Sequence, residues 1–297
     1  MARASFIVLL FIFCNIASAQ ENDDLFSRLQ AISNSGVKFY NVDGIEISSQ
    51  EKDHAFTAKN ISRGFPQLKI RFKELVNSDS LLDFKNYYVF KSIEGPEDIF
   101  NSITYYFIET IDQKIIAFTF TPSNEENKDF EREFVRLVRD NAIPGDVFNH
   151  PEPDTINFAG RKIPLGKQCH WMGVNNVQCS SAGQMNWSVH KDSTSASNTV
   201  ESHFESIQAR QNGKVVSDTK VKVMFEGTET TARKIIYDFT GITAAMVAMT
   251  GGRNLTIYFV AVPVRQHYVS CVMSYWNNDY LTENGLAPLL DQVMKLK

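Results

Sequence analysis

Cysteine and histidine are the residue types in this chain most able to do covalent chemistry, and one of each lies near the C-terminus. His267 and Cys271 are four residues apart in a stretch (255–276) whose apolar runs predict two strands joined by a turn at Arg265 and Gln266. A cysteine with a neighbouring histidine could act as a nucleophile with its base. Four residues of a strand, however, span about 13 Å at roughly 3.3 Å per residue, which is beyond hydrogen-bond reach. His267 is therefore not expected to activate Cys271.

A histidine from elsewhere in the chain would be needed for such chemistry. The candidates are His170 and His203, and His190 is a third possibility. An alternative function is therefore a thiol-dependent or other hydrolase that uses Cys271 with a distant histidine. No serine lies in a G-x-S-x-G elbow, and the six histidines show neither H-E-x-x-H nor paired spacing. The sequence predicts no metal site and no cofactor.

Residues 1–19 have the pattern of a secretory signal peptide. A positive charge at Arg3 precedes an apolar run (6–13), and residues 17–19 form a small-residue cleavage site. The apolar run is too short to cross a bilayer core, which takes roughly 20 helical residues. The sequence therefore predicts a secreted or periplasmic protein whose mature chain has no transmembrane segment.

Removal of the signal peptide would also remove Cys14 and leave an odd number of cysteines. In an oxidising compartment that number implies one disulfide and one free thiol. If residues 173–175 turn a hairpin, Cys169 and Cys179 lie opposite each other with Cβ atoms about 4.5–5.5 Å apart, close to what a disulfide requires. The sequence predicts a Cys169–Cys179 disulfide and a buried Cys271 thiol. A disulfide from Cys271 to either of the other two is the alternative.

The charge of the chain argues against one class of partner. The formal net charge is −4, and the Lys and Arg residues are scattered among acidic residues. Proteins that bind nucleic acid usually concentrate basic residues in one patch. We therefore expect no nucleic-acid partner.

An earlier stretch of the chain repeats the C-terminal pattern. Residues 103–120 have the same two apolar runs as residues 255–276, and an amphipathic helix is predicted shortly after each. A chain of 297 residues exceeds what one hydrophobic core usually organises. We expect an α+β fold of two similar units, each an antiparallel sheet with a C-terminal helix packed on it. The predicted parts are a signal peptide at 1–19, an N-terminal domain at 20–143, a linker at 144–155 and a C-terminal domain at 156–297.

Four local predictions bear on the sites described below. Apolar spacing predicts a helix at residues 24–36 and another at about residues 198–211. A terminal helix is predicted to start at Asn284 and to carry an apolar stripe over residues 286–294. Residues 241–250 are apolar without a clean period, which predicts a buried connection. The alternative for this segment is an adaptable binding surface, for which methionine is well suited.

The candidate binding residues are aromatic and methionine side chains in the second half of the chain. They are Trp171, Trp187, Met246, Met249 and Trp276. Aromatic side chains among Asn, Gln and Ser can bind sugars, peptides or proteins. Ordinary core packing is the alternative for each tryptophan.

These features together predict an exported, non-catalytic binding or interaction protein. Its partner would be an unknown protein, an envelope component or a small ligand. Besides the hydrolase, an inhibitor or immunity-type protein is an alternative, which the sequence does not separate from a binding protein.

Overall fold

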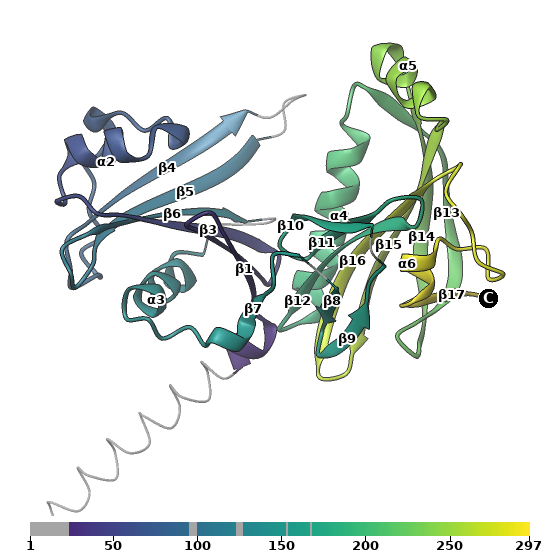
Figure 1. Cartoon of the computed structure of the whole chain (residues 1–297), viewed down its shortest axis with the longest axis horizontal. Helices are drawn as coiled ribbons and strands as arrows, with labels where there is room; N and C mark the ends of the chain where they lie inside the picture. Colours follow the sequence, from purple (N-terminus) through teal and green to yellow (C-terminus); the bar gives the residue numbers. More distant parts are fainter. Residues whose placement is uncertain (1–23, 95–99, 123–126, 153, 167) are drawn as a thin grey trace, which may run out of the picture.

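The computed structural model shows a mixed α+β fold in which strands predominate (Figure 1). The strands form a seven-stranded sheet, here termed the first sheet, an eight-stranded second sheet and a two-stranded hairpin. The predicted signal peptide lies outside the described residues. The described residues are 24–94, 100–122, 127–152, 154–166 and 168–297.

The first sheet is built from residues that precede position 150. Its strands are β1 (Gln30–Asn34), β2 (Val37–Val42), β3 (Ile45–Lys52), β4 (Asn86–Glu94), β5 (Phe100–Glu109), β6 (Ile115–Pro122) and β7 (Phe148–Asn149), in the order β4-β5-β6-β3-β2-β1-β7. The hairpin predicted at 103–120 is confirmed as β5 and β6. Ser35 and Gly36 turn β1 into β2 with the positive φ angles of a two-residue hairpin turn. β7 pairs with β1 in parallel and comes from the segment predicted as a linker.

The predicted helix at residues 24–36 is wrong after its first turns. Only residues 24–28 are helical, and Ile32 lies in β1, where it pairs with Phe39 of β2. The apolar spacing at the start of this segment fits a helix, but helical pattern alone stabilises a short segment weakly. Pairing with β2 decides the outcome.

Helical segments cover both faces of the first sheet. Helix α3 (Lys128–Arg139) packs on one face, where Phe134 meets the Tyr40 ring edge-on at a centroid distance of 5.0 Å. Helix α2 (Ala58–Gly64) and two 3-10 turns cover the other face. In the described residues, the 3-10 segments are η1 (Pro66–Leu68), η2 (Phe72–Glu74) and η4 (Gly145–Val147).

The second sheet holds the hairpin predicted at residues 255–276. Its strands are β10 (Cys169–Gly173), β11 (Asn176–Cys179), β12 (Gly183–His190), β13 (Gly213–Phe225), β14 (Thr228–Phe239), β15 (Asn254–Val264), β16 (His267–Trp276) and β17 (Met294–Leu296), in the order β10-β11-β12-β16-β15-β14-β13-β17. The predicted turn at Arg265 and Gln266 joins β15 to β16, and Val260 pairs with Cys271. This hairpin lies in the middle of the sheet.

The two faces of the second sheet have different covers. Helix α4 (Ser193–Gln208) lies on one face, where Phe204 contacts Phe259 edge-on at 5.7 Å. This helix corresponds to the one predicted at about 198–211 and starts earlier. The hairpin of β8 (Thr155–Phe158) and β9 (Arg161–Pro164), together with helix α6 (Pro288–Asp291), covers the opposite face.

The long terminal helix predicted from Asn284 is wrong. Helix α6 has only four residues, and residues 294–296 form β17 on the outer edge of β13. The apolar residues of the predicted stripe are buried as expected. They pack on the sheet from a short helix and a strand because the free edge of β13 offers backbone hydrogen bonds to the chain terminus.

The turn between β2 and β3 joins the first sheet to the second. Asp43 donates its backbone N–H to the Val189 carbonyl at 3.0 Å, and its carboxylate accepts the Lys191 N–H at 2.8 Å. The same carboxylate accepts from the buried Arg28 guanidinium at 3.1 Å. Next to it, the Ser188 hydroxyl donates to Asn41 Oδ1 at 2.6 Å. The contact between the sheets is therefore polar and directional.

No helix in the described part of the chain has the length and apolar composition needed to cross a membrane.

Candidate functional site

The structure does not bring Cys271 together with the histidines proposed as its base. Cys271 is fully buried and faces the core between the second sheet and the β8–β9 hairpin. His203 lies on α4, which covers the opposite face of the sheet. Trp171 of β10 packs toward the same core as Cys271, so its neighbour His170 points to the other face. The sheet itself separates both imidazoles from the thiol.

Burial also makes Cys271 a poor nucleophile. Desolvation raises the pKa of the thiol well above its usual value, because the thiolate would be charged in an apolar core. His267 lies on the same strand, where it pairs with Val264, and does not contact the thiol at this spacing.

We expect Cys271 to be inert in the native protein. In iodoacetamide labelling at pH 8, followed by mass spectrometry, native Cys271 should react at least about a hundredfold more slowly than in guanidinium, since reaction requires opening of the core. The unfolded protein is the control for intrinsic reactivity. Rapid labelling of the folded protein would contradict this burial.

His190 is a buried histidine whose partners are two hydroxyl groups. Its Nδ1 lies 2.9 Å from Ser195 Oγ and its Nε2 lies 2.8 Å from Ser270 Oγ. Burial lowers the pKa of His190 to about 4, and the nearby Asp43 carboxylate opposes this only in part. The imidazole is therefore neutral at pH 7 and holds β12, β16 and α4 together.

The predicted disulfide between Cys169 and Cys179 is present. The two residues are direct partners in the antiparallel register of β10 and β11, with Cα atoms 4.0 Å apart. Cys271 is the free thiol, as predicted.

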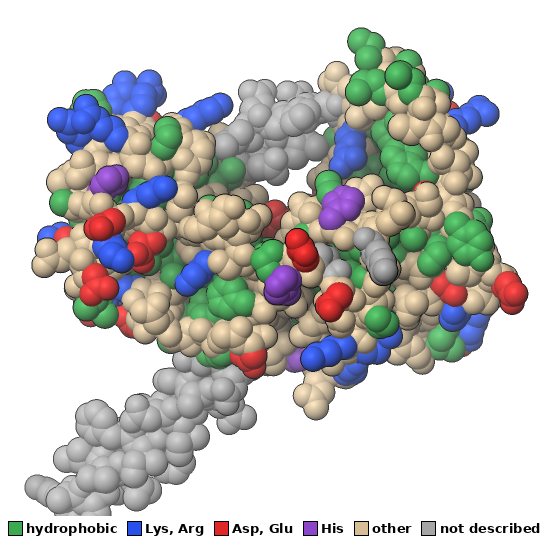
Figure 2. All heavy atoms as spheres, in the orientation of Figure 1, with side chains coloured by type: hydrophobic (Ala, Val, Ile, Leu, Met, Phe, Trp, Pro, Cys, Tyr) green, Lys and Arg blue, Asp and Glu red, His purple; other side chains and the backbone are tan. Residues whose placement is uncertain are grey.

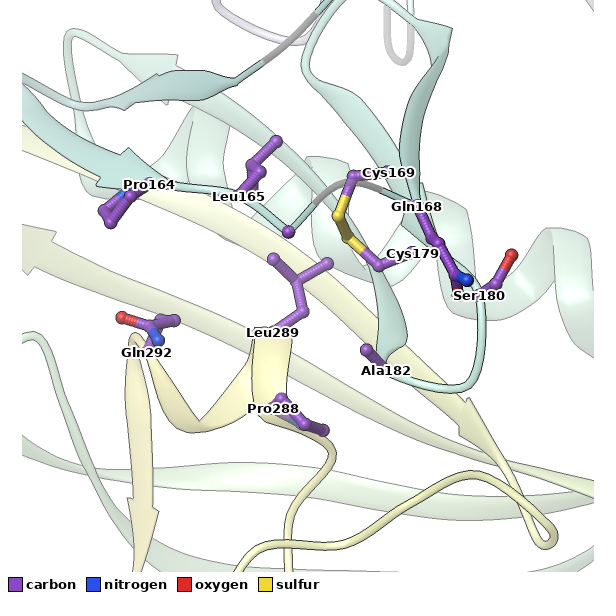
Figure 3. A pocket seen from close by; sticks show the side chains of 11 residues that line it. Pro164, Leu165, Gln168, Cys169, Cys179, Ser180, Ala182, Pro288, Leu289 and Gln292 are labelled. Carbon is purple, nitrogen blue, oxygen red and sulfur yellow. A yellow bond between two sulfur atoms is a disulfide. The ribbon is translucent and has the colours of Figure 1, made fainter.

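A cavity of about 320 Å³ lies beside this disulfide (Figure 3). Leu165 and Leu289 line it from two different segments, and Gln168 and Gln292 supply amide groups. The described lining residues carry no charged side chain and no histidine. The cavity could therefore hold a small molecule, but these residues provide no acid, base or activated nucleophile.

The three tryptophans differ in what they offer to a ligand. Trp187 is buried against Phe158 and presents no surface. Trp171 is half-buried, and its indole N–H donates to the His150 carbonyl at 2.9 Å. Trp276 is also half-buried and stacks on Phe239 at a centroid distance of 5.4 Å. Each tryptophan already has a structural contact within the protein.

Helix α5 (Gly241–Met249) is the most exposed apolar element in the described part of the second half. The prediction of a buried connection at residues 241–250 is wrong, because no residue of this helix is buried. Ile242, Met246 and Met249 are 83%, 63% and 87% exposed. The helix follows the C-terminal end of β14, at the end of the β13–β14 pair opposite their turn, and hydrophobic side chains gather there on the molecular surface (Figures 1 and 2).

The exposed side chains of α5 form one stripe. Ile242, Met246 and Met249 follow i, i+4, i+7 spacing, and the exposed Ala245 lies between them. In a globular protein this spacing normally marks the face that packs on the core. Here the less exposed Val247 faces the protein and packs close to the backbone of Gly252. A Cβ atom added to Gly252 would lie only 3.1 Å from the Val247 Cγ1. We term Ile242, Ala245, Met246 and Met249 the α5 stripe.

The described residues contain no group of three or more His, Cys, Asp and Glu side chains that could hold a metal ion.

Comparisons with known proteins yield only distant likenesses. No family model matches the chain, and no curated protein matches it significantly. The apo structure of the immunity protein TplEi of the T6SS from Pseudomonas aeruginosa is 8% identical, with 90% of this chain and 97% of that chain covered, at a TM-score of 0.25. The di-domain ARO/CYC StfQ from the steffimycin biosynthetic pathway is 10% identical, with 84% and 73% covered, at a TM-score of 0.17. Likeness at this level carries no argument about the fold or activity of this chain.

Proposed function

We propose that this chain is an exported, non-catalytic protein that binds a partner protein through the α5 stripe. The proposal rests on one observation: the apolar face of α5, which has the spacing of a face that packs on a core, points to solvent. Apolar anchors at i, i+4 and i+7 are the pattern by which a helix occupies a groove of a partner. Methionine suits such a contact because its side chain is flexible and polarizable.

A protein groove suits α5 better than a membrane surface. Helices that lie in a bilayer interface carry Lys or Arg on one side and often Trp or Phe on the other. Residues 241–252 contain no charged residue and no aromatic residue. The proposed partner therefore has an apolar groove or patch.

Two observations support the remaining parts of the proposal. The Cys169–Cys179 disulfide suits an oxidising compartment outside the cytosol, in agreement with the predicted signal peptide. The sheet lies between the thiol of Cys271 and two of its candidate bases, His170 and His203, which favours binding over thiol catalysis.

The test is site-specific photo-crosslinking from position 245 in the cells that produce the protein. We expect one cross-linked partner protein. With the purified partner, the I242S/M246S/M249S variant should bind about 30- to 1000-fold more weakly, since three apolar side chains lose about 2–4 kcal/mol of burial free energy. Isothermal titration calorimetry gives the Kd.

The matched control changes exposed apolar residues in the loop that precedes β4 of the first sheet. Val76 and Leu81 are 72% and 62% exposed, so V76S/L81S removes comparable apolar surface far from α5 in the sequence. This variant should keep the affinity of the wild type. Equal losses in both variants, or no cross-link from position 245, would overturn the assignment of α5.

A further inference from the structure

Strand β13 leaves most of one edge of the second sheet open. Its ladder with β14 runs along the whole strand, whereas β17 covers only Val223, Met224 and Phe225. In the described part of the chain, residues 213–222 have no partner strand on their outer side. This edge starts beside α5, because Gly213 pairs with Phe239 just before that helix begins (Figure 1).

A hydrogen bond at the end of β13 that β17 covers shows which backbone groups of this edge point outward. The Lys297 N–H donates to the Lys222 carbonyl at 3.2 Å, so the backbone of Lys222 faces the outer side. Alternate residues of a strand direct their N–H and C=O groups to the same side. The backbones of Lys220 and Asp218 therefore also point outward. An unpaired row of this kind is a template for another strand.

Three lysines set the charge of the open edge. Lys214, Lys220 and Lys222 are exposed, and none of them forms an ion pair with another described residue. Two nearby acidic groups interact with these lysines and also with a second basic group: Asp218 pairs with Arg233 at 2.8 Å and lies near Lys220, and Glu229 pairs with Lys297 and lies near Lys222. Asp238 lies opposite Lys214 in the register of β13 and β14. Residues 213–222 themselves carry three lysines and one acidic residue, so the strand has a net positive charge.

This charge identifies the occupant that the edge fits. Antiparallel pairing with a second copy, centred on Lys220, would set each Lys222 opposite Asp218 of the other copy but would place the two Lys220 side chains directly opposite each other, where like charges are destabilising. An acidic strand would instead place carboxylates beside the lysine ammonium groups. Val216, at the register shift between Val215 and Ser217, is 51% exposed and adds an apolar side chain to the surface of this strand.

We propose that the open edge of β13 is a second docking site, which takes up an extended acidic segment of a partner protein as an added strand. The inference rests on the proposed function in that the ligand is a protein. It uses different residues, so it can fail while the assignment of α5 stands.

The probe is a synthetic ten-residue peptide in which every second residue is Glu and the residues between are Thr or Val. The comparison peptide carries Lys at each Glu position. Amide hydrogen exchange of the full chain should slow at Lys220 and Asp218 when the acidic peptide is added. The basic peptide should leave these amides unchanged. Affinity, measured by fluorescence anisotropy, should fall at least about tenfold when salt shortens the Debye length from about 30 Å to about 8 Å. Absence of exchange protection, or equal binding of both peptides, would overturn the proposal.

Charge reversal at Lys220 and Lys222 tests whether peptide binding depends on this edge or only on the net charge of the protein. The K220E/K222E variant should lose at least about tenfold in affinity for the acidic peptide and gain affinity for the basic one. The control K73E/K162E makes the same charge change at exposed lysines away from β13 and should bind as the wild type does. The α5 variant I242S/M246S/M249S should also bind the peptide normally. An equal loss in the lysine control would show that binding follows net charge and would overturn the site.

Discussion

Replacing Asp43 with alanine is expected to lower the free energy of unfolding by about 2–3 kcal/mol. Although Asp43 lies in the turn between β2 and β3 of the first sheet, the substitution should destabilise the second sheet. The substitution leaves the Lys191 N–H without its acceptor and the 5% exposed Arg28 with only Asp24 as a charged partner. Removing one member of a buried pair typically costs about 3–5 kcal/mol, and the remaining Asp24 contact reduces that cost. Guanidinium unfolding measures the change.

The tryptophans make this measurement specific to the second sheet. Trp171, Trp187 and Trp276 all lie in that sheet, so their fluorescence reports its unfolding, whereas far-UV circular dichroism reports both sheets. Asp112→Ala, at an exposed turn of the first sheet, is the control and should change stability by less than about 0.5 kcal/mol. If the tryptophan transition of Asp43→Ala matched that of the wild type, the turn would not couple the sheets.

The features that the sequence predicted well are those set by local pairing. The hairpin of β15 and β16 and the Cys169–Cys179 disulfide each depend on a turn and two short flanking runs, and their register follows once the turn is placed. The helix predicted from Asn284 failed for the opposite reason. Its last residues pair with β13, which is about seventy residues earlier in the chain, and apolar spacing carries no information about such a distant edge.

The candidate site shows the same limit. The spacing of Ile242, Met246 and Met249 was visible in the sequence, but a stripe predicts which face of a helix is apolar and not whether the fold covers it. Likewise, Cys271 and His203 could be proposed as a pair because the sequence does not reveal which face of the sheet α4 covers. The order of the strands and the placement of α4 decide that question.

The network around His190 should make the protein less stable in mild acid. The pKa of His190 is about 4 in the folded protein and about 6.5 when unfolded. Between these values the unfolded state binds the proton and the folded state does not. The free energy of unfolding should therefore be fully retained above pH 6.5 and fall by roughly 3 kcal/mol as the pH drops toward 4, at up to about 1.4 kcal/mol per pH unit. Guanidinium titrations at several pH values measure this slope.

Comparison of variants isolates His190 from other groups that titrate in the same range. Burial also lowers the pKa of His203 and of His267, and these two groups add to the pH dependence of the free energy of unfolding. Their contribution is the same in the wild type and in a His190→Gln variant, so it cancels in the difference between the two. His190→Gln should be less stable at pH 7, because Ser195 and Ser270 lose their imidazole partner, and the deficit should shrink as the pH falls. His54→Gln, at an exposed position, should keep the wild-type profile. A deficit that stays constant from pH 7 to pH 4.5 would show that the buried imidazole does not control the acid sensitivity.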